Sequence, residues 1–293
     1  MISATVGIYD GVHLGHVRIL RELQKNLGRH IVFLFFKNPK KGDNILTNLK
    51  ERKEILSSSG VEVINLDIKK FWRMAAYDFL DKFLVRKYGV GNLIAGDDFV
   101  FGHRRRGTIS DLRKWTKEKN INFKVVPGVK LKNKKISTSL IKECLEKNAL
   151  DTANKMLGRC YAVTGRKIKG LGIAGSLGFP TINLKPEKHK ILPEGVFFVK
   201  SACVSGDFFA LANVGSSPTF GLKNVFELYA LPGYSPKIFR CRNFNVSFLK
   251  FIRKQKKFKT KKHLAARINK DVKLACKFSL NFVKNAGSKR RRK

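Results

Sequence analysis

The chain has 293 residues, about twice the size of an ordinary domain, and 43% of them are hydrophobic. These values predict two globular domains and exclude a disordered protein. The 61 Lys and Arg residues against 21 Asp and Glu give a formal net charge of +40, which attracts polyanions. No arginine-rich helix, aromatic stacking pair or zinc-finger spacing accompanies the charge, so we expect nucleic acid to bind only non-specifically.

The five cysteines are at least sixteen residues apart, and none belongs to a CxxC pair. Their odd number and wide spacing predict reduced thiols in the cytoplasm, and argue against a disulfide framework or a zinc ribbon. The apolar run "IVFLFF" is too short to span a bilayer, and no charged-then-apolar leader precedes Val6. We therefore expect a cytoplasmic protein with no membrane partner.

Up to about Gly158, β-branched or aromatic runs alternate with helical patterns. The runs predicted as strands cover residues 3–9, 30–36, 61–66, 92–96 and 123–128. Helices are predicted between them, for example over 16–27 and 75–88. Strict alternation of strand and helix predicts a Rossmann-like α/β domain with a parallel sheet and crossover helices, which we assign to residues 1–157.

After Gly158 the strand-like runs follow one another without helices between them. They cover residues 160–170, 194–206, 208–215, 225–231 and 243–253. This pattern predicts an antiparallel barrel or sandwich over residues 158–284. A final helix is predicted from about Thr260, with Leu264, Ile268, Val272 and Leu274 at helical spacing, and residues 285–293 form a basic tail.

The stretch "VGIYDGVHLGH", residues 6–16, is expected to join the first strand to the first helix. In open parallel sheets, ligands bind beyond the carboxyl ends of the strands, where such loops lie. Gly11 and Gly15 would let the backbone approach a phosphate, and His13 and His16 could contact its oxygens near a helix N-terminus. Zinc is not expected, because only Asp10 is nearby as a further ligand. The stretch therefore predicts nucleotide binding.

"GIYDGVHLGH" resembles the HxGH signature of nucleotidyltransferases, and its form with "DG" ahead of "VHLGH" resembles the bacterial bifunctional riboflavin kinase and FAD synthetase family. The resemblance implies a nucleotidyltransferase domain followed by an antiparallel flavokinase barrel with a C-terminal helix. It implies that ATP phosphorylates riboflavin to FMN, and that FMN is then adenylylated to FAD with release of pyrophosphate. His13 and His16 would stabilise the charge that builds on the phosphates.

Two further motifs of the first half resemble the same family. "AGDDFVFGHRRRGT" resembles the segment that lines the flavin and ATP cleft, which implies that Asp98 and Phe99, together with Pro39, bind flavin. "ISTSLIK" resembles a phosphate-contacting loop, but by itself it is typical of a helix N-cap at Ser137 or Thr138. The implied ATP ligands of this loop are Ser137, Thr138, Ser139 and Lys142.

In the second half, "GRKIKGLGIAGSLGFPTINL" resembles the flavokinase glycine loop and its "PTAN" box. The resemblance implies that Thr181 and Asn183 bind Mg²⁺ through oxygen atoms. "VFELYAL" places Glu227 at the position of the family's catalytic base, which takes the proton of the terminal riboflavin hydroxyl. A single Glu on a strand is otherwise usually an exposed surface residue. The implied ATP ligands of the glycine loop are Gly165, Gly170 and Gly172.

The chain departs from the family pattern at several positions. Lys37 and Asn38 replace a Pro and a His, Lys142 replaces an Arg and so loses the fork geometry, and Gly175 stands where an Arg is common. Three alternatives stay open. The chain could be an enzyme with only one of the two activities or an adenylyltransferase for another phosphorylated acceptor, and the net charge of +40 is also compatible with a nucleic-acid-binding protein on the same scaffold.

Overall fold

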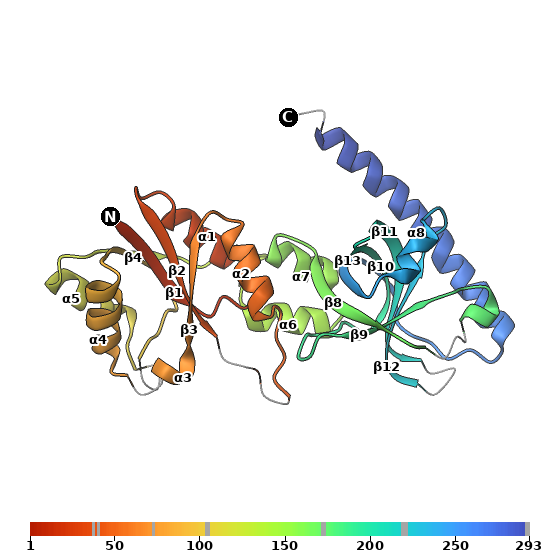
Figure 1. Ribbon diagram of the computed structural model, residues 1–293, viewed down its shortest axis with the longest axis horizontal. Helices are drawn as coiled ribbons and strands as arrows, with labels where there is room; N and C mark the ends of the chain where they lie inside the picture. Colours follow the sequence, from red (N-terminus) through yellow and green to blue (C-terminus); the bar gives the residue numbers. More distant parts are fainter. Residues whose placement is uncertain are drawn as a thin grey trace. The chain divides into compact units, whose positions relative to one another are not determined.

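The computed structural model describes residues 1–36, 39, 42–71, 74–102, 106–170, 174–217 and 222–290. The chain divides into two compact units (Figure 1). The first unit comprises residues 1–141 and 156–158, and the second comprises residues 142–155 and 159–293. The helices α6 (Thr138–Glu146) and α7 (Leu150–Leu157) carry the chain from the first unit into the second.

The first unit is built on the predicted parallel sheet. Its strands are β1 (Ile2–Gly7), β2 (Arg29–Phe36), β3 (Glu62–Asp67), β4 (Val90–Gly96) and β5 (Asn122–Val126). They lie in the order β3-β2-β1-β4-β5, and every pair is parallel. The strand order changes direction between β1 and β4, so the loops after these two strands flank the crevice where such sheets bind ligands.

Helices cover both faces of this sheet (Figure 1). Along β2, Ile31 and Phe33 pack in one apolar cluster, whereas Val32 and Leu34 pack in another. Burial on both faces explains why β2 appears as an unbroken apolar run. The first cluster includes side chains of η1 (Phe79–Lys87) and α5 (Ile109–Glu118), and the second includes side chains of α1 (Leu14–Leu23) and α2 (Leu49–Ser57).

The helix predicted over residues 75–88 is present, but most of it is η1, which has the wider π-helical hydrogen bonding. It follows the short helices α3 (Ile68–Phe71) and α4 (Ala76–Asp78). Phe79 and Leu84 are buried, and Phe83 packs at the edge of the same cluster. These three side chains therefore attach the helix to the core of the first unit. A two-stranded ribbon, β6 (Lys130–Leu131) and β7 (Lys134–Lys135), precedes α6.

The second unit contains a closed barrel in which every strand pair is antiparallel, as predicted. Its strands are β8 (Tyr161–Ile168), β9 (Ile182–Pro186), β10 (Gly195–Cys203), β11 (Gly206–Ser217), β12 (Leu222–Ala230) and β13 (Asn243–Arg253). They close in the order β10-β11-β12-β9-β8-β13. The 3-10 turns η3 (Gly175–Leu177) and η4 (Pro236–Arg240) lie in the connections.

The last helix, α8 (Lys261–Arg290), packs against an apolar surface of this barrel (Figure 1). Its Ala275 and Phe278 join Val196, Phe198 and Leu211 in one cluster. The predicted helical positions Leu264, Ile268 and Val272 are half-buried, but Leu274 is 39% exposed and lies outside the packed stripe.

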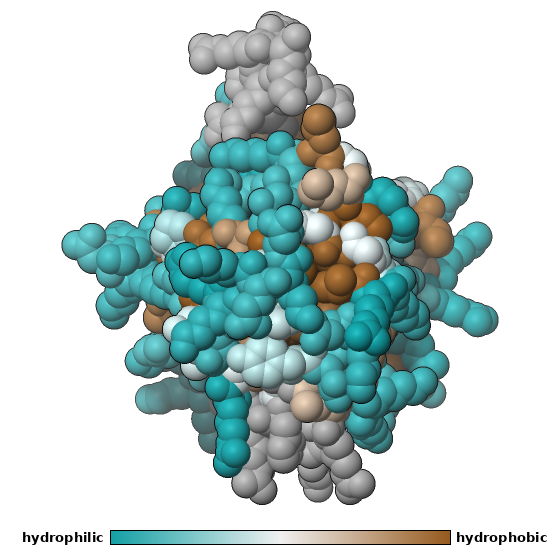
Figure 2. All heavy atoms as spheres, turned by 90° about the vertical axis from the view of Figure 1, so that its left-hand side faces the viewer, coloured by the Kyte–Doolittle hydropathy of each residue, from teal (hydrophilic) through white to brown (hydrophobic). Residues whose placement is uncertain are grey.

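Figure 2 shows a face of the protein on which hydrophilic side chains cover most of the surface, with smaller hydrophobic areas between them. This distribution agrees with the 61 Lys and Arg residues of the chain. Within the described ranges, no helix has both the length and the apolar character that crossing a membrane requires.

Candidate active sites

The loop between β1 and α1 holds an unusual backbone conformation. Tyr9 and Val12 have φ values of 52° and 37°, in the left-handed region that side chains other than glycine disfavour. Such residues cost roughly 1–3 kcal/mol each and persist only where the surroundings hold them. The loop therefore depends on contacts from other segments.

A buried ion pair supplies much of that support. Arg52, the fourth residue of α2, donates from Nη2 to Asp10 Oδ1 at 2.8 Å, and both residues are less than 10% exposed. The guanidinium also donates to the Ile8 carbonyl at 3.1 Å and to the Thr47 carbonyl at 2.8 Å. The backbone N–H groups of Leu46 and Thr47 donate to the Asp10 carboxylate. The guanidinium of Arg52 and these two backbone N–H groups thus compensate the buried charge of Asp10.

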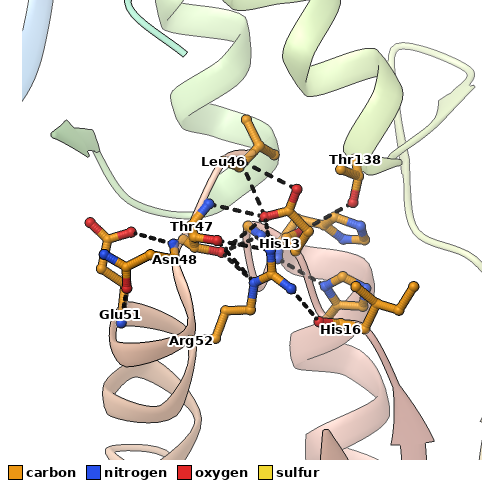
Figure 3. A network of polar contacts seen from close by, with 11 residues as sticks. His13, His16, Leu46, Thr47, Asn48, Glu51, Arg52 and Thr138 are labelled. Atoms are coloured by element: carbon orange, nitrogen blue, oxygen red, sulfur yellow. Dashed lines mark hydrogen bonds and ion pairs between the residues drawn. The ribbon is translucent and has the colours of Figure 1, made fainter. Parts of the chain in front are cut away.

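Two threonines complete this network, as Figure 3 shows for Thr47, Thr138 and the loop that carries His13. The Gly11 N–H donates to Thr47 Oγ1 at 2.8 Å, and Thr138 Oγ1 donates to the Asp10 carbonyl at 3.0 Å. The loop after β1, the start of α2 and the start of α6 are therefore fixed to one another. The loop and the start of α6 carry residues of the predicted phosphate site, and the start of α2 supports the loop.

The two predicted histidines lie against each other at the start of α1. Their ring centroids are 3.7 Å apart and nearly parallel, and the His13 N–H donates to His16 Nδ1 at 3.3 Å. Because Nδ1 accepts this bond, the neutral His16 ring carries its proton on Nε2 and can donate it to a ligand. A Cβ atom on Gly15 would lie 3.0 Å from His13 Cε1, so glycine leaves room for this ring. The pair lies at the N-terminal turn of α1, where the positive end of the helix dipole favours an anion such as phosphate.

The other predicted residues of this unit lie on loops or in the first turn of α6. Ser137 caps α6, because its Oγ accepts from the Leu140 N–H at 3.2 Å, and Ser139 is exposed. Asp98 follows β4 and is ion-paired with Lys135 at 3.1 Å, while Phe99 packs on the core. Pro39 follows β2 and is half-buried.

Three further residues of the first half that the sequence motifs singled out are Lys37, Asn38 and Lys142. Lys142 is half-buried in α6 and belongs to the second compact unit. Lys37 and Asn38, the departures from the family pattern, lie outside the described residues.

In the barrel, three polar residues of adjacent strands lie in one row. Glu227 of β12 is in register with Asn183 of β9 on one side and with Asn213 of β11 on the other. Residues directly opposite in paired strands point to the same face of the sheet. Their strand neighbours, such as Phe226 and Leu228, are buried in the barrel. The row therefore faces outward from the barrel core.

Hydrogen bonds orient this row. Gln255 Nε2 donates to Asn213 Oδ1 at 2.9 Å, which leaves the Asn213 NH₂ group to donate to the Glu227 carboxylate. Burial raises the pKa of Glu227 above its ordinary value, and the hydrogen bond from Asn213 opposes that rise. A carboxylate with a raised pKa that is held by a fixed donor has the properties of a general base.

Glu227 and Thr181 line a cavity of about 110 Å³ together with Asn213 and Gln255. The apolar part of the wall comes from the barrel and from α8, which contributes Leu264 and Ile268. The remaining lining residues are Ala174, Phe179, Val196, Leu211, Tyr229, Arg253, Lys256, Phe258 and Asp271. The predicted base thus lines a mostly apolar cavity that also contains a few polar groups. Ligand-binding sites typically have this character.

A buried carboxylate anchors α8 to one wall of this cavity. Asp271 is 3% exposed and accepts from Arg253 Nε at 2.8 Å. Arg267 Nε lies 3.2 Å from the other oxygen of Asp271. Arg253 ends β13, so this ion pair fixes the last strand to the helix.

The predicted glycines of the second half occupy different environments. A Cβ atom on Gly170 would lie 2.0 Å from Asn183 Nδ2, so glycine is required for the Asn183 amide to lie where it does. Gly165 is buried within β8, where a Cβ atom would lie 3.0 Å from Leu184 Cβ. Gly172 lies outside the described residues. A Cβ atom on Gly175 would meet nothing within 4 Å, so packing does not require glycine there.

Sequence reasoning missed most residues that support these sites. Thr47 and Arg52 gave no local signal, because they contact a loop about 40 positions away. Asn213 lies in the strand predicted over residues 208–215, but only the strand register reveals its place beside Glu227. Gln255 and Asp271 likewise belong to no motif that we recognised.

Two family models match the chain, one for each half. The FAD synthetase model matches residues 1–140, and the riboflavin kinase model matches residues 157–279.

Curated relatives match along nearly the whole chain. Proteins named bifunctional riboflavin kinase/FMN adenylyltransferase are 32% identical in Buchnera aphidicola subsp. Schizaphis graminum, over 94% of this chain and 93% of the relative, and 32% identical in Haemophilus influenzae, over 94% of each. A crystal structure described as a macrolide-efflux protein from Streptococcus pneumoniae is 26% identical, covers 93% of each chain and superposes with a TM-score of 0.82.

Proposed function

Because the chain belongs to the family of bifunctional riboflavin kinase/FMN adenylyltransferases, we propose that it performs both reactions of that name. It is a transferase that phosphorylates riboflavin to FMN with ATP and adenylylates FMN to FAD. We assign the second reaction to residues 1–157 and the first to residues 158–284. The observation that carries this proposal for the kinase is that Glu227 and Thr181 line one cavity.

In the kinase reaction, Glu227 takes the proton of the terminal riboflavin hydroxyl while its oxygen attacks the γ-phosphorus of ATP, and ADP leaves. Asn213 and Gln255 hold the Glu227 carboxylate in place. The apolar wall that includes Leu264 and Ile268 suits the flat, largely apolar ring system of a flavin.

Mg²⁺ is the metal that such a phosphoryl transfer requires, and the residues present fit it. Thr181 offers a hydroxyl oxygen and Asn183 an amide oxygen, and Mg²⁺ prefers oxygen ligands shared with substrate phosphates. Close packing of Gly170 on the Asn183 amide fixes that side chain. We propose that Thr181 and Asn183 hold the ion, which neutralises charge on the phosphates when it is bound.

In the adenylyltransferase reaction, a phosphate oxygen of FMN bonds to the α-phosphorus of ATP, and the bond from that phosphorus to the pyrophosphate oxygen breaks. His13, His16 and the positive end of the α1 helix dipole stabilise the charge on the phosphates. Ser137, Thr138, Ser139 and Lys142 help to position them. Asp98, Phe99 and Pro39 are the proposed flavin contacts.

The other proposed properties follow from composition. We propose a cytoplasmic location, with the five cysteines as free thiols under reducing conditions. Nucleic acid would bind to the net charge of +40 without sequence preference, and the affinity would fall steeply with salt.

The direct test supplies riboflavin, ATP and Mg²⁺ to the purified chain and follows the flavins by chromatography. We expect FMN to appear first and FAD to follow at its expense. FMN without FAD would remove the first unit from the proposal, and FAD formed only from supplied FMN would remove the second. A protein with no turnover that binds RNA tightly would overturn both assignments.

A further inference from the structure

Two cysteines outside both proposed sites have their sulfur atoms in unusually close contact. Cys203 ends β10, and Cys241 follows η4 in the connection to β13. Their Sγ atoms lie 2.7 Å apart, which is closer than two unbonded thiols normally approach and about 0.7 Å beyond the length of a disulfide bond. Only a small movement separates this contact from a covalent bond.

The two thiols differ in solvent exposure and in the direction of their pKa shifts. Cys203 is half-buried beside Val204, which is 96% exposed, whereas Cys241 is only 3% exposed. Burial raises the pKa of the Cys203 thiol. Burial also acts against ionisation of Cys241, but hydrogen bonds with Cys203 and Ser205 hold the pKa of the Cys241 thiol below its ordinary value. The Cys241 sulfur lies 3.3 Å from Ser205 Oγ.

We propose that Cys203 and Cys241 form a reversible disulfide when the protein meets a low-molecular-weight disulfide such as oxidised glutathione. The thiolate of the more accessible Cys203 attacks one glutathione sulfur, which forms a mixed disulfide and releases the first glutathione thiolate. The Cys241 thiolate then attacks the Cys203 sulfur and releases the second. The two protein thiols lose two electrons and two protons, and one glutathione disulfide becomes two thiols.

This bond would close a loop of 38 residues that contains β11 and β12. Constraining so long a segment lowers the entropy of the unfolded chain, so the oxidised barrel should unfold at a temperature roughly 5–10 °C higher. Cys203 pairs with Gly206, and Glu227 pairs with Asn213 of the same strand β11. Seven residues of strand span about 24 Å, which separates the disulfide from Glu227. The oxidised protein should therefore form FMN at a rate within about twofold of that of the protein with free thiols.

The test treats the purified full-length chain with oxidised glutathione, blocks free thiols with iodoacetamide and maps the peptides by mass spectrometry. Chymotrypsin, which cuts after aromatic residues, should release the linked peptides 199–208 and 240–244, and the thiol titre of the unfolded protein should fall from five to three. Thermal unfolding is then compared with that of the reduced protein.

Cys203→Ser should abolish both the linked peptide and the rise in unfolding temperature. Cys276→Ser, which removes a half-buried thiol from α8, should abolish neither. Because Cys241 is buried, Cys241→Ala serves only as a second check on the linked peptide. Five free thiols after oxidation, a bridge between other cysteines, or a bridge that leaves the unfolding temperature unchanged would overturn the proposal.

Discussion

The proposed phosphate-binding histidines stand on a loop of the parallel-sheet unit, whereas the proposed base of the kinase stands on a strand of the barrel. The loop has two non-glycine residues with positive φ, and the buried Asp10–Arg52 pair holds it. Glu227 needs no such support, because strand pairing already fixes its neighbours Asn183 and Asn213. The comparison indicates that the first site depends on long-range polar contacts and the second on backbone register.

The largest expected effect comes from Glu227→Gln, which keeps the size of the side chain and removes the base. FMN formation should fall by about 10²–10⁴-fold, the usual contribution of a general base. FAD formation from supplied FMN should be unchanged. Steady-state assays of the two half-reactions check this, and equal losses in both would break the assignment of one site to each unit.

Substitution of His16 should have the opposite selectivity. In His16→Asn the amide oxygen can still accept from the His13 N–H, but nothing replaces the donor at Nε2. FAD formation should fall by about 10²–10³-fold, as when one preorganised donor to a charged transition state is lost.

His16→Gln, which can place a donor near the Nε2 position, is the matched variant and should recover part of the FAD-forming rate. FMN formation from riboflavin should be unaffected in both variants. If His16→Gln were no better than His16→Asn, the proposed donation from Nε2 would be wrong.

Asp10→Asn tests whether the buried ion pair with Arg52 holds the loop between β1 and α1. The substitution leaves the Arg52 guanidinium buried without its counter-charge, and the free energy of unfolding should fall by about 3 kcal/mol or more. Both tryptophans of the chain, Trp72 and Trp115, lie in the first half, so urea unfolding followed by tryptophan fluorescence reports on this unit.

The matched control is Glu62→Gln, which breaks the exposed ion pair with Arg29. Its side chains are 46% and 63% exposed, so the loss should be below about 1 kcal/mol. Equal losses in Asp10→Asn and Glu62→Gln would mean that the buried pair does not hold the loop.

The smallest effect concerns the pH dependence of the kinase. Because burial raises the pKa of Glu227, the rate of FMN formation should fall, as the pH decreases, at a pH above the ordinary Glu value of about 4.3. The hydrogen bond from Asn213 stabilises the ionised carboxylate, so Asn213→Ala should move this inflection to still higher pH. A profile of kcat/KM against pH for both proteins measures the shift, and an inflection that moved to lower pH would contradict the proposed contact.

Sequence patterns predicted the alternating α/β unit, the barrel and the final helix, because hydrophobic periodicity and turn residues are local signals. Motifs also placed His13, His16 and Glu227 on the elements where the structure has them. The partners of these residues were out of reach, since Asp10 meets Arg52 across 42 positions and Gln255 meets Asn213 across another 42. The π-helical form of η1 was missed for a different reason: an amphipathic pattern does not specify which hydrogen-bond spacing the backbone adopts.

A mixing experiment tests most directly whether two independent sites act in sequence. Glu227→Gln and His16→Asn are each incubated alone, and then together, with riboflavin, ATP and Mg²⁺, and FAD is quantified over time. Two separate sites predict almost no FAD from either variant and clear FAD production from the mixture, because FMN made by one protein reaches the other. A mixture of two folded variants that accumulates FMN without FAD, or makes neither product, would contradict this division of labour.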